Sequence, residues 1–208
     1  MKKKQITANP APIPQAPTQK SVYKAQKPKE GPSFNDIPQF PRAHYEVDIS
    51  WDYLEDHLKH YFEAYNLDLD PDFQRAHIWT REQQTAYVEY CLMGGEVGRN
   101  LTFNHPSWNT TLGRDSHRME IIDGKQRLEA VRSFLRNEFP VFSHKFLEYT
   151  DFPRIATVGF RFRICSLETR EQILQMYLNI NAGGTPHTKE ELDKVRNMLS
   201  KERSDVNK

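Results

Sequence analysis

Five segments of the chain begin with a residue that can cap a helix. These residues are Ser50, Thr80, Asp123, Thr169 and Thr188. At the last four, a Gln or Glu follows three positions later, which is the spacing of a capping box. Behind Ser50, apolar residues recur at helical spacing until Leu67-Asp-Leu-Asp-Pro71 interrupts them. The sequence therefore predicts five helices, of which the second ends near Met93 at Gly94-Gly95 and the fourth near Asn181.

Three shorter segments are predicted to be strands. They lie around Asn100–Phe103, at Met119–Ile122 and at Val158–Ile164. In the last of them apolar residues alternate with Gly and Arg, as in a strand that buries one face. A turn is expected at Gly183-Gly184. Short strands mixed with longer helices predict a compact α+β (mixed α/β) domain over residues 43–208, in which a small sheet packs against helices.

Residues 1–42 have a different composition. They hold eight of the 13 prolines and an excess of six positive charges, whereas the rest of the chain carries a net charge of −5. Such a segment buries too little apolar surface to offset its chain entropy, so we expect a disordered or extended arm. The arm could attract a polyanion such as DNA over a long range. It could equally serve only to keep the protein in solution.

Composition limits the class of protein. The chain has 208 residues, 37% of them hydrophobic and 27% charged, and no segment approaches the roughly 20 apolar residues that span a bilayer. No apolar run follows the first residues, so no secretory signal is expected. The two cysteines, Cys91 and Cys165, have neither the spacing of a metal site nor that of a disulfide framework. These features favour a cytoplasmic protein without a membrane span.

The segment Ile121–Leu128 combines a predicted strand end with charged residues. A strand that turns directly into a helix leaves the first N–H groups of the helix unpaired, and the helix dipole adds partial positive charge there. Lys125 and Arg127 stand on that first turn, and Gly124 lets a ligand approach the backbone closely. Together they predict a phosphate-binding site, at which Asp123 could hold a metal-bound water or a ribose hydroxyl.

A purely structural interpretation of this segment is also open. In it, Asp123 and Gln126 only cap the helix, and the two cations face water. Trp79 likewise has two interpretations: it could stack on a nucleic-acid base, or it could anchor the helix that follows it. The second is favoured, because a large apolar ring before a capping box is typical of a buried anchor.

Three motifs in order resemble one known family. They are Leu69-Asp-Pro-Asp-Phe-Gln-Arg75 followed by Ile78-Trp79, then Ile122-Asp-Gly-Lys-Gln-Arg-Leu128, then Tyr177-Leu-Asn-Ile-Asn-Ala-Gly-Gly-Thr-Pro186 followed by Glu190-Glu-Leu192. This order is similar to that of the ParB/sulfiredoxin-like family defined by an Asp-Gly-Gln-Gln-Arg motif. Its members include the N-terminal domain of the S subunit in GmrSD-type restriction systems.

The resemblance implies a ParB/sulfiredoxin-like fold and a site that binds, and could also hydrolyse, a nucleoside triphosphate, with Mg²⁺ as a cofactor. The implied catalytic residues are Asp123, Gln126 and Arg127, with Asp123 as the metal ligand. The implied nucleotide-binding residues are Gln74, Arg75, Gly124, Lys125, Asn181, Gly183, Gly184 and Thr185. Lys125 replaces the family's first Gln, which adds positive charge suited to phosphate but removes an amide.

Three functions remain open at this point. One is a nucleoside triphosphatase that acts on DNA together with a nuclease partner. Another is a non-enzymatic module that binds DNA or a protein through the arm. The third is a nuclease acting alone, which needs the fold to gather Asp68, Asp70, Asp72 and Asp123 around a metal. Sulfinic-acid repair is not expected, because the strand-to-helix turn contains no cysteine.

Overall fold

The computed structural model describes residues 43, 45–75, 79–108, 117–151, 153–181 and 189–206, all within one unit, Phe40–Lys208. The predicted arm, the Gly183-Gly184 turn with Thr185, and the Thr188 cap lie outside the described residues. Among the described helices, none is both long and apolar enough to cross a membrane.

Four strands form one mixed sheet in the order β1-β4-β2-β3. They are β1 (Tyr45–Ser50), β2 (Asn100–Asn104), β3 (Glu120–Asp123) and β4 (Gly159–Cys165). β1 and β4 are antiparallel, β4 and β2 are parallel, and β2 and β3 are antiparallel with an irregularity between Thr102 and Phe103. The parallel pair requires the chain to cross from β2 to β4, and β3 and α3 lie within that crossover.

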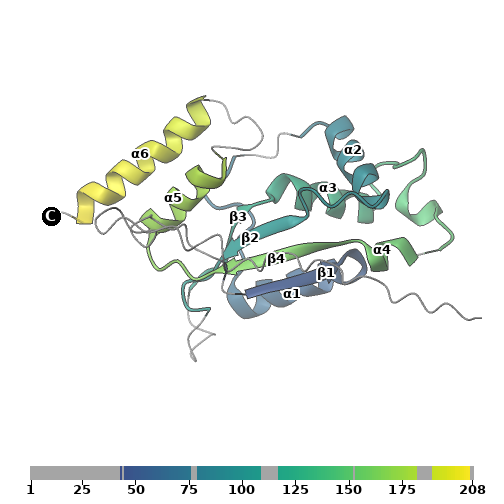
Figure 1. Cartoon of the computed structure of the whole chain (residues 1–208), viewed down its shortest axis with the longest axis horizontal. Helices are drawn as coiled ribbons and strands as arrows, with labels where there is room; N and C mark the ends of the chain where they lie inside the picture. The colour runs from purple at the N-terminus through teal and green to yellow at the C-terminus, as the bar shows by residue number, and fades with distance from the viewer. Residues whose placement is uncertain are drawn as a thin grey trace, which may run out of the picture. The chain divides into compact units, whose positions relative to one another are not determined.

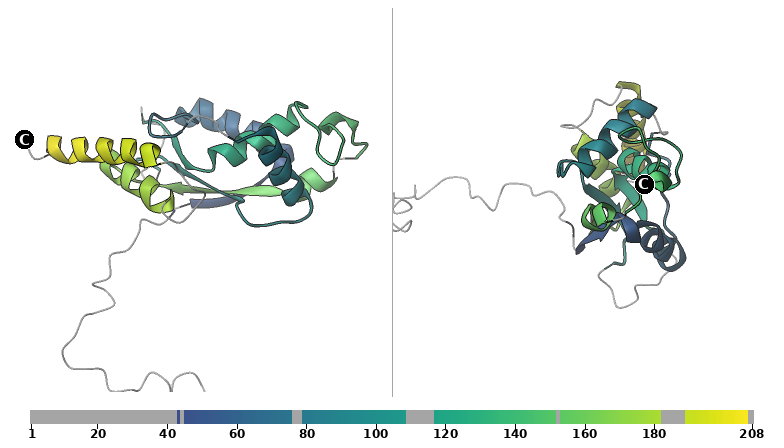
Figure 2. Two further views of the ribbon diagram at one scale, coloured as in Figure 1. Left: turned by 90° about the horizontal axis from the view of Figure 1, so that it is seen from above. Right: turned by 90° about the vertical axis from the view of Figure 1, so that its right-hand side faces the viewer.

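Six α-helices and two short 3₁₀ helices accompany the sheet in the described part of the chain. The α-helices are α1 (Leu54–Tyr65), α2 (Arg81–Leu92), α3 (Lys125–Leu135), α4 (Pro153–Thr157), α5 (Arg170–Asn181) and α6 (Lys189–Val206). The 3₁₀ helices are η3 (Trp51–Tyr53) and η4 (Phe146–Glu148). Figures 1 and 2 show α5 and α6 side by side at one end of the sheet. The predicted α+β class, a small sheet with helices, is confirmed.

The sheet separates two hydrophobic clusters. The larger cluster joins the sheet to α1, α2 and α3, and the smaller one joins it to α5 and α6. Two adjacent residues of β3 belong to different clusters. Ile121 belongs to the larger cluster and Ile122 to the smaller, and both are fully buried. Because neighbouring side chains of a strand point to opposite faces, β3 ends where the two clusters meet.

The alternation predicted for β4 is present. Phe160, Phe162 and Ile164 are buried, whereas the two arginines between them point away from that core. Arg161 pairs with Asp48 at 2.8 Å and Arg163 with Glu46 at 2.8 Å, each directly across from its partner on β1. The hydrogen bond from Arg161 lowers the pKa of Asp48. These cross-strand ion pairs help to set the register of β1 on β4.

Two capping predictions are wrong. Ser50 ends β1 and precedes η3, and its side chain makes no cap bond, while α1 begins only at Leu54. The strand β1 was not predicted, although its six residues alternate strictly between apolar and polar, which is the pattern of a half-buried strand. The N-cap of α3 is Gly124, with φ +101°, and it provides no side-chain cap. Asp123 instead pairs with Arg127.

The other two described caps are confirmed. Thr80 and Gln83 form a reciprocal capping box, and α2 ends at Leu92, one residue before the predicted end. Thr169 Oγ1 accepts from the Gln172 N–H at 3.2 Å, and Gln172 Oε1 accepts from the Thr169 N–H at 3.2 Å. The predicted strands also match β2, β3 and β4 to within about one residue at each end.

Phe162→Ala tests the larger cluster. Phe162 is fully buried and its ring centroid lies 4.9 Å from that of Phe103, so we expect a loss of about 3–5 kcal/mol in the free energy of unfolding. Leu147→Ala is the control: Leu147 is 70% exposed, so its replacement should change stability by less than about 0.5 kcal/mol. Urea unfolding measures both. Equal losses for the two variants would contradict this description of the core.

Candidate functional site

The turn from β3 into α3 depends on a glycine. Gly124 lies at φ +101°, a region that disfavours side chains, and a Cβ there would lie 2.2 Å from Leu101 Cδ2. The first intrahelical bond runs from the Leu128 N–H to the Gly124 carbonyl at 2.9 Å. The N–H groups of the preceding residues therefore lie at the uncapped, partially positive end of the helix.

A cavity of about 690 Å³ opens at this helix end. Residues of all three motif segments line it: Gln74 and Arg75 of the first, Ile122 to Arg127 of the second, and Tyr177, Ile180 and Asn181 of the third. Every predicted site residue that the structure describes therefore lies at one cavity. Gly183, Gly184 and Thr185 lie outside the described residues. Such a volume is typical of small-ligand sites, which hold roughly 300–1,000 Å³.

Arg127 connects two parts of the cavity lining. One guanidinium nitrogen donates to Asp123 Oδ2 at 2.5 Å, and another donates to the Gly98 carbonyl at 2.7 Å. Among the described residues that line the cavity, Asp123 is the one carboxylate, and its side chain is 29% exposed. The planar guanidinium of Arg127 therefore lies beside a carboxylate, that of Asp123, which solvent can still reach.

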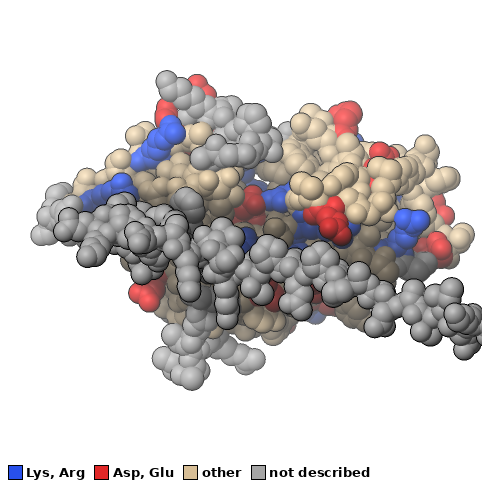
Figure 3. All heavy atoms as spheres, viewed as in Figure 1, with Lys and Arg blue, Asp and Glu red and all other residues tan. Residues whose placement is uncertain are grey.

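The other two cations at the cavity also have carboxylate partners. Lys125 donates to Asp70 and, at 3.0 Å, to the Arg75 carbonyl. The Arg75 guanidinium lies 3.6 Å from Glu191 of α6. Figure 3 shows that Lys and Arg side chains lie next to Asp and Glu side chains on the part of the described surface that is in view. An anionic ligand would have to compete with these carboxylates for the cations.

The amides of the motifs tie segments of the fold together. Gln74 Nε2 donates to the carbonyls of Ile121 and Ile122 at 3.0 and 2.7 Å. Gln126 is buried, and its Oε1 accepts from the Trp79 N–H at 3.1 Å. Asn181 Nδ2 donates to the Tyr177 carbonyl at 2.7 Å. The bond from Gln74 to Ile122 and the bond from Trp79 to Gln126 hold the first motif against the second.

Several residues of the cavity escaped the sequence analysis. They are Tyr87 and Tyr90 of α2, and Val97 and Gly98 of the loop that follows. Trp79, predicted to be only an anchor, packs against the larger cluster as expected and also lines the cavity. The three-residue spacing of the two tyrosines, which places them on one helix face, was the available signal.

Residues 58–157 match the family model of the GmrSD restriction endonuclease, N-terminal domain. This match covers just under half of the chain, from α1 to α4. It contains the first two motif segments and the aromatic residues of α2, and it excludes the third motif segment. No curated protein and no solved structure matches the chain. The GmrSD part of the expected resemblance is thus confirmed over this region, and the wider relation to ParB and sulfiredoxin stays a prediction.

Two tyrosines that line the cavity, Tyr87 and Tyr177, have raised pKa values because their hydroxyl groups are buried. Burial raises the pKa of Tyr177 to about 12 and raises that of Tyr87 further. Both therefore stay protonated at neutral pH, so they can donate hydrogen bonds but cannot act as general bases.

The carboxylates that a nuclease acting alone would need are dispersed. Asp68 pairs with Arg118 at 2.9 Å, Asp72 pairs with Arg170, and Asp70 pairs with Lys125. Across the described ranges there is no group of three or more His, Cys, Asp or Glu residues that could hold a metal ion. Asp123 remains able to contribute a single oxygen ligand to Mg²⁺ bound mainly by phosphates, as is usual for that ion.

Gly124→Ala tests the turn, with Gly94→Ala as its matched control. Both glycines have positive φ, +101° and +96°, but a Cβ at Gly94 would meet nothing within 4 Å. We expect each substitution to cost about 1–2 kcal/mol from backbone strain. Gly124→Ala should cost a further 1–3 kcal/mol or so from overpacking against Leu101. Urea unfolding compares them, and equal losses would show that the contact with Leu101 is unimportant.

Proposed function

We propose that this chain binds a nucleoside triphosphate at the N-terminus of α3 and acts in a restriction system, with a nuclease partner that cleaves DNA. One observation carries the proposal. Three segments that lie far apart in the sequence converge on a single cavity at an uncapped helix N-terminus, and each contributes polar or charged residues to it.

The phosphates are assigned to the α3 end of the cavity. The helix terminus offers backbone N–H groups and partial positive charge, and Gly124 keeps the approach to the backbone clear. Arg127 supplies a planar fork suited to phosphate oxygens, and Lys125 and Arg75 supply further positive charge nearby. These are the components that phosphate sites on helix termini generally combine.

Magnesium enters this proposal with the nucleotide. Asp123 is the protein ligand that we assign to it, because it is the one carboxylate among the described lining residues and is partly exposed. A single carboxylate with phosphate oxygens and waters suits Mg²⁺. Asp123 would then exchange its contact with Arg127 for one with the metal, which would leave Arg127 to bind phosphate. Hydrolysis is a further step, with Asp123, Gln126 and Arg127 as its proposed residues.

The role in restriction is supported by the GmrSD match at residues 58–157. The printed description of that family is a restriction endonuclease, so the proposed partner is a nuclease and the proposed target is DNA. The alternative is a non-enzymatic module that binds DNA or protein through its basic arm. Calorimetric titration with triphosphates in excess magnesium separates the two, since the alternative gives no binding to the body of the protein.

Arg127→Ala tests the phosphate assignment. A charge-assisted hydrogen bond contributes about 1.5–3 kcal/mol, so we expect affinity for a nucleoside triphosphate to fall by about 10- to 150-fold. Arg196→Ala is the control, because Arg196 is an exposed arginine of α6 that pairs only locally with Asp193. Titration calorimetry measures both variants. Unchanged affinity in Arg127→Ala would remove Arg127 from the site.

Asp70→Asn tests the competition between carboxylates and ligand for the cations. Asp70 is 79% exposed and pairs with Lys125, so its neutralisation should leave the fold intact and free Lys125 for phosphate. Because an exposed ion pair contributes at most about 1 kcal/mol, we expect affinity to rise by up to about fivefold. Asp193→Asn, which removes a comparable exposed pair on α6, should have no effect. A fall in affinity with Asp70→Asn would contradict the assignment of Lys125.

A further inference from the structure

An aromatic wall faces the cavity beside the α3 terminus. Trp79, Tyr87 and Tyr90, which come from α2 and the residues before it, line the cavity together with Val97. Tyr90 is 37% exposed and Val97 is 78% exposed, so both leave apolar surface accessible to a ligand in the cavity that they line. None of these four residues carries a charge, so the wall has little to offer a phosphate.

The wall is held together by its own tyrosines. The Tyr87 hydroxyl donates to the Gly98 carbonyl at 2.9 Å, and the Tyr90 hydroxyl accepts from the Val97 N–H at 3.2 Å. Gly95 lies directly against the Tyr90 ring, because a Cβ there would be 2.3 Å from it. The loop after α2 is thus fastened to the helix face that bears the rings.

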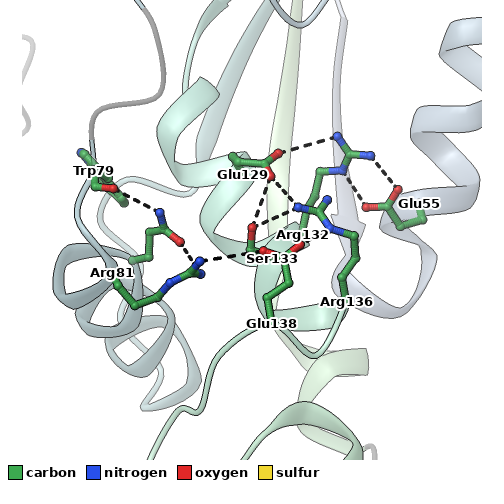
Figure 4. A network of polar contacts seen from close by, with 9 residues as sticks. Glu55, Trp79, Arg81, Glu129, Arg132, Ser133, Arg136 and Glu138 are labelled. Atoms are coloured by element: carbon green, nitrogen blue, oxygen red, sulfur yellow. Dashed lines mark hydrogen bonds and ion pairs between the residues drawn. The ribbon is translucent and has the colours of Figure 1, made fainter.

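The wall also has a fixed position relative to the phosphate end. The Gly98 carbonyl that accepts from Tyr87 accepts from Arg127 as well, at 2.7 Å. At the start of α2, Arg81 donates to Gln84 at 2.8 Å and lies 3.9 Å from Glu138, and Gln84 donates to the Trp79 carbonyl at 3.1 Å. Figure 4 shows this network, which joins the start of α2 to the segment after α3.

We propose that the aromatic wall is a nucleobase subsite, in which the base lies against Tyr90 and Val97 while the phosphates lie at α3. This inference rests on the proposed function and adds the chemical class of the ligand: a purine nucleoside triphosphate in preference to a pyrimidine one or to inorganic triphosphate. Stacking on an aromatic ring tolerates any base, and a purine covers more of the ring.

Titration calorimetry in excess magnesium tests the subsite with ATP, GTP, CTP, UTP and inorganic triphosphate. Inorganic triphosphate has the phosphates without base or ribose, so it probes the α3 end alone. For the wild-type chain we expect the purine nucleotides to bind at least about tenfold more tightly than inorganic triphosphate, as a single base stack would give. Equal affinities for inorganic triphosphate and all four nucleotides would overturn the subsite and leave the proposed function standing.

Variants of the wall locate the effect. Tyr90→Ala should lower purine nucleotide affinity about tenfold and leave that of inorganic triphosphate unchanged, whereas Tyr90→Phe, which keeps the ring, should retain the purine preference. Val97→Ser, at a largely exposed side chain that folding does not require, should weaken the purine preference in the same direction. Tyr53→Ala is the control, since Tyr53 is 65% exposed on η3 and does not line the cavity.

Two other outcomes would count against the inference. If Tyr90→Ala, with an unchanged melting temperature, weakened nucleotide and inorganic triphosphate equally, the ring would not contact the base. If neither inorganic triphosphate nor any nucleotide bound to the wild-type chain, the proposed function itself would fail, and the subsite with it. Loss of the nucleotide preference alone is therefore distinguishable from loss of phosphate binding.

Discussion

The close packing of Gly124 on Leu101 is the constraint on which the site depends. β3 must end and α3 must begin within one residue, and only a residue without a Cβ can make that turn at φ +101° with Leu101 directly behind it. Just before this turn, Ile121 and Ile122 of β3 are buried in different hydrophobic clusters on opposite faces of the sheet. The uncapped helix end consequently projects from the place where the two hydrophobic clusters meet.

Amide side chains of the motifs then bring the remaining segments to this turn. Gln74 satisfies the carbonyls of the last buried residues of β3, and Gln126 satisfies the N–H of Trp79. An unpaired polar group at such positions would be unfavourable, so these bonds specify one arrangement of the first and second motifs. Trp79 in turn stands at the start of α2, whose tyrosines face the cavity. A single chain of contacts thus runs from the turn to the aromatic wall.

Electrostatics at the cavity are balanced rather than strongly positive. Each of Arg75, Lys125 and Arg127 has a carboxylate partner, and the body of the chain carries a net negative charge. Affinity for an anion therefore depends on local exchange of partners more than on long-range attraction, which salt screens within about 10 Å. Partner exchange favours a ligand with several closely spaced negative charges and a cation of its own, which a magnesium-bound triphosphate has.

The sequence by itself determined the fold class, the capping boxes at Thr80 and Thr169, and the set of residues that line one side of the cavity. These features depend on local patterns: the spacing of polar caps, the alternation along β4, and the order of three short motifs. The strict alternation of Tyr45–Ser50 was also a strand signal in the sequence. Only the tertiary structure decided which strand β1 pairs with, because Arg161 and Arg163 of β4 lie more than 100 residues away. It also decided that Asp123 pairs with Arg127 instead of capping α3, since the left-handed turn at Gly124 takes over the cap position. The aromatic wall likewise depends on packing. The spacing of Tyr87 and Tyr90 places them on one face of α2, but their hydrogen bonds with Gly98 and Val97 of the following loop, which hold them at the cavity, cannot be read from that spacing.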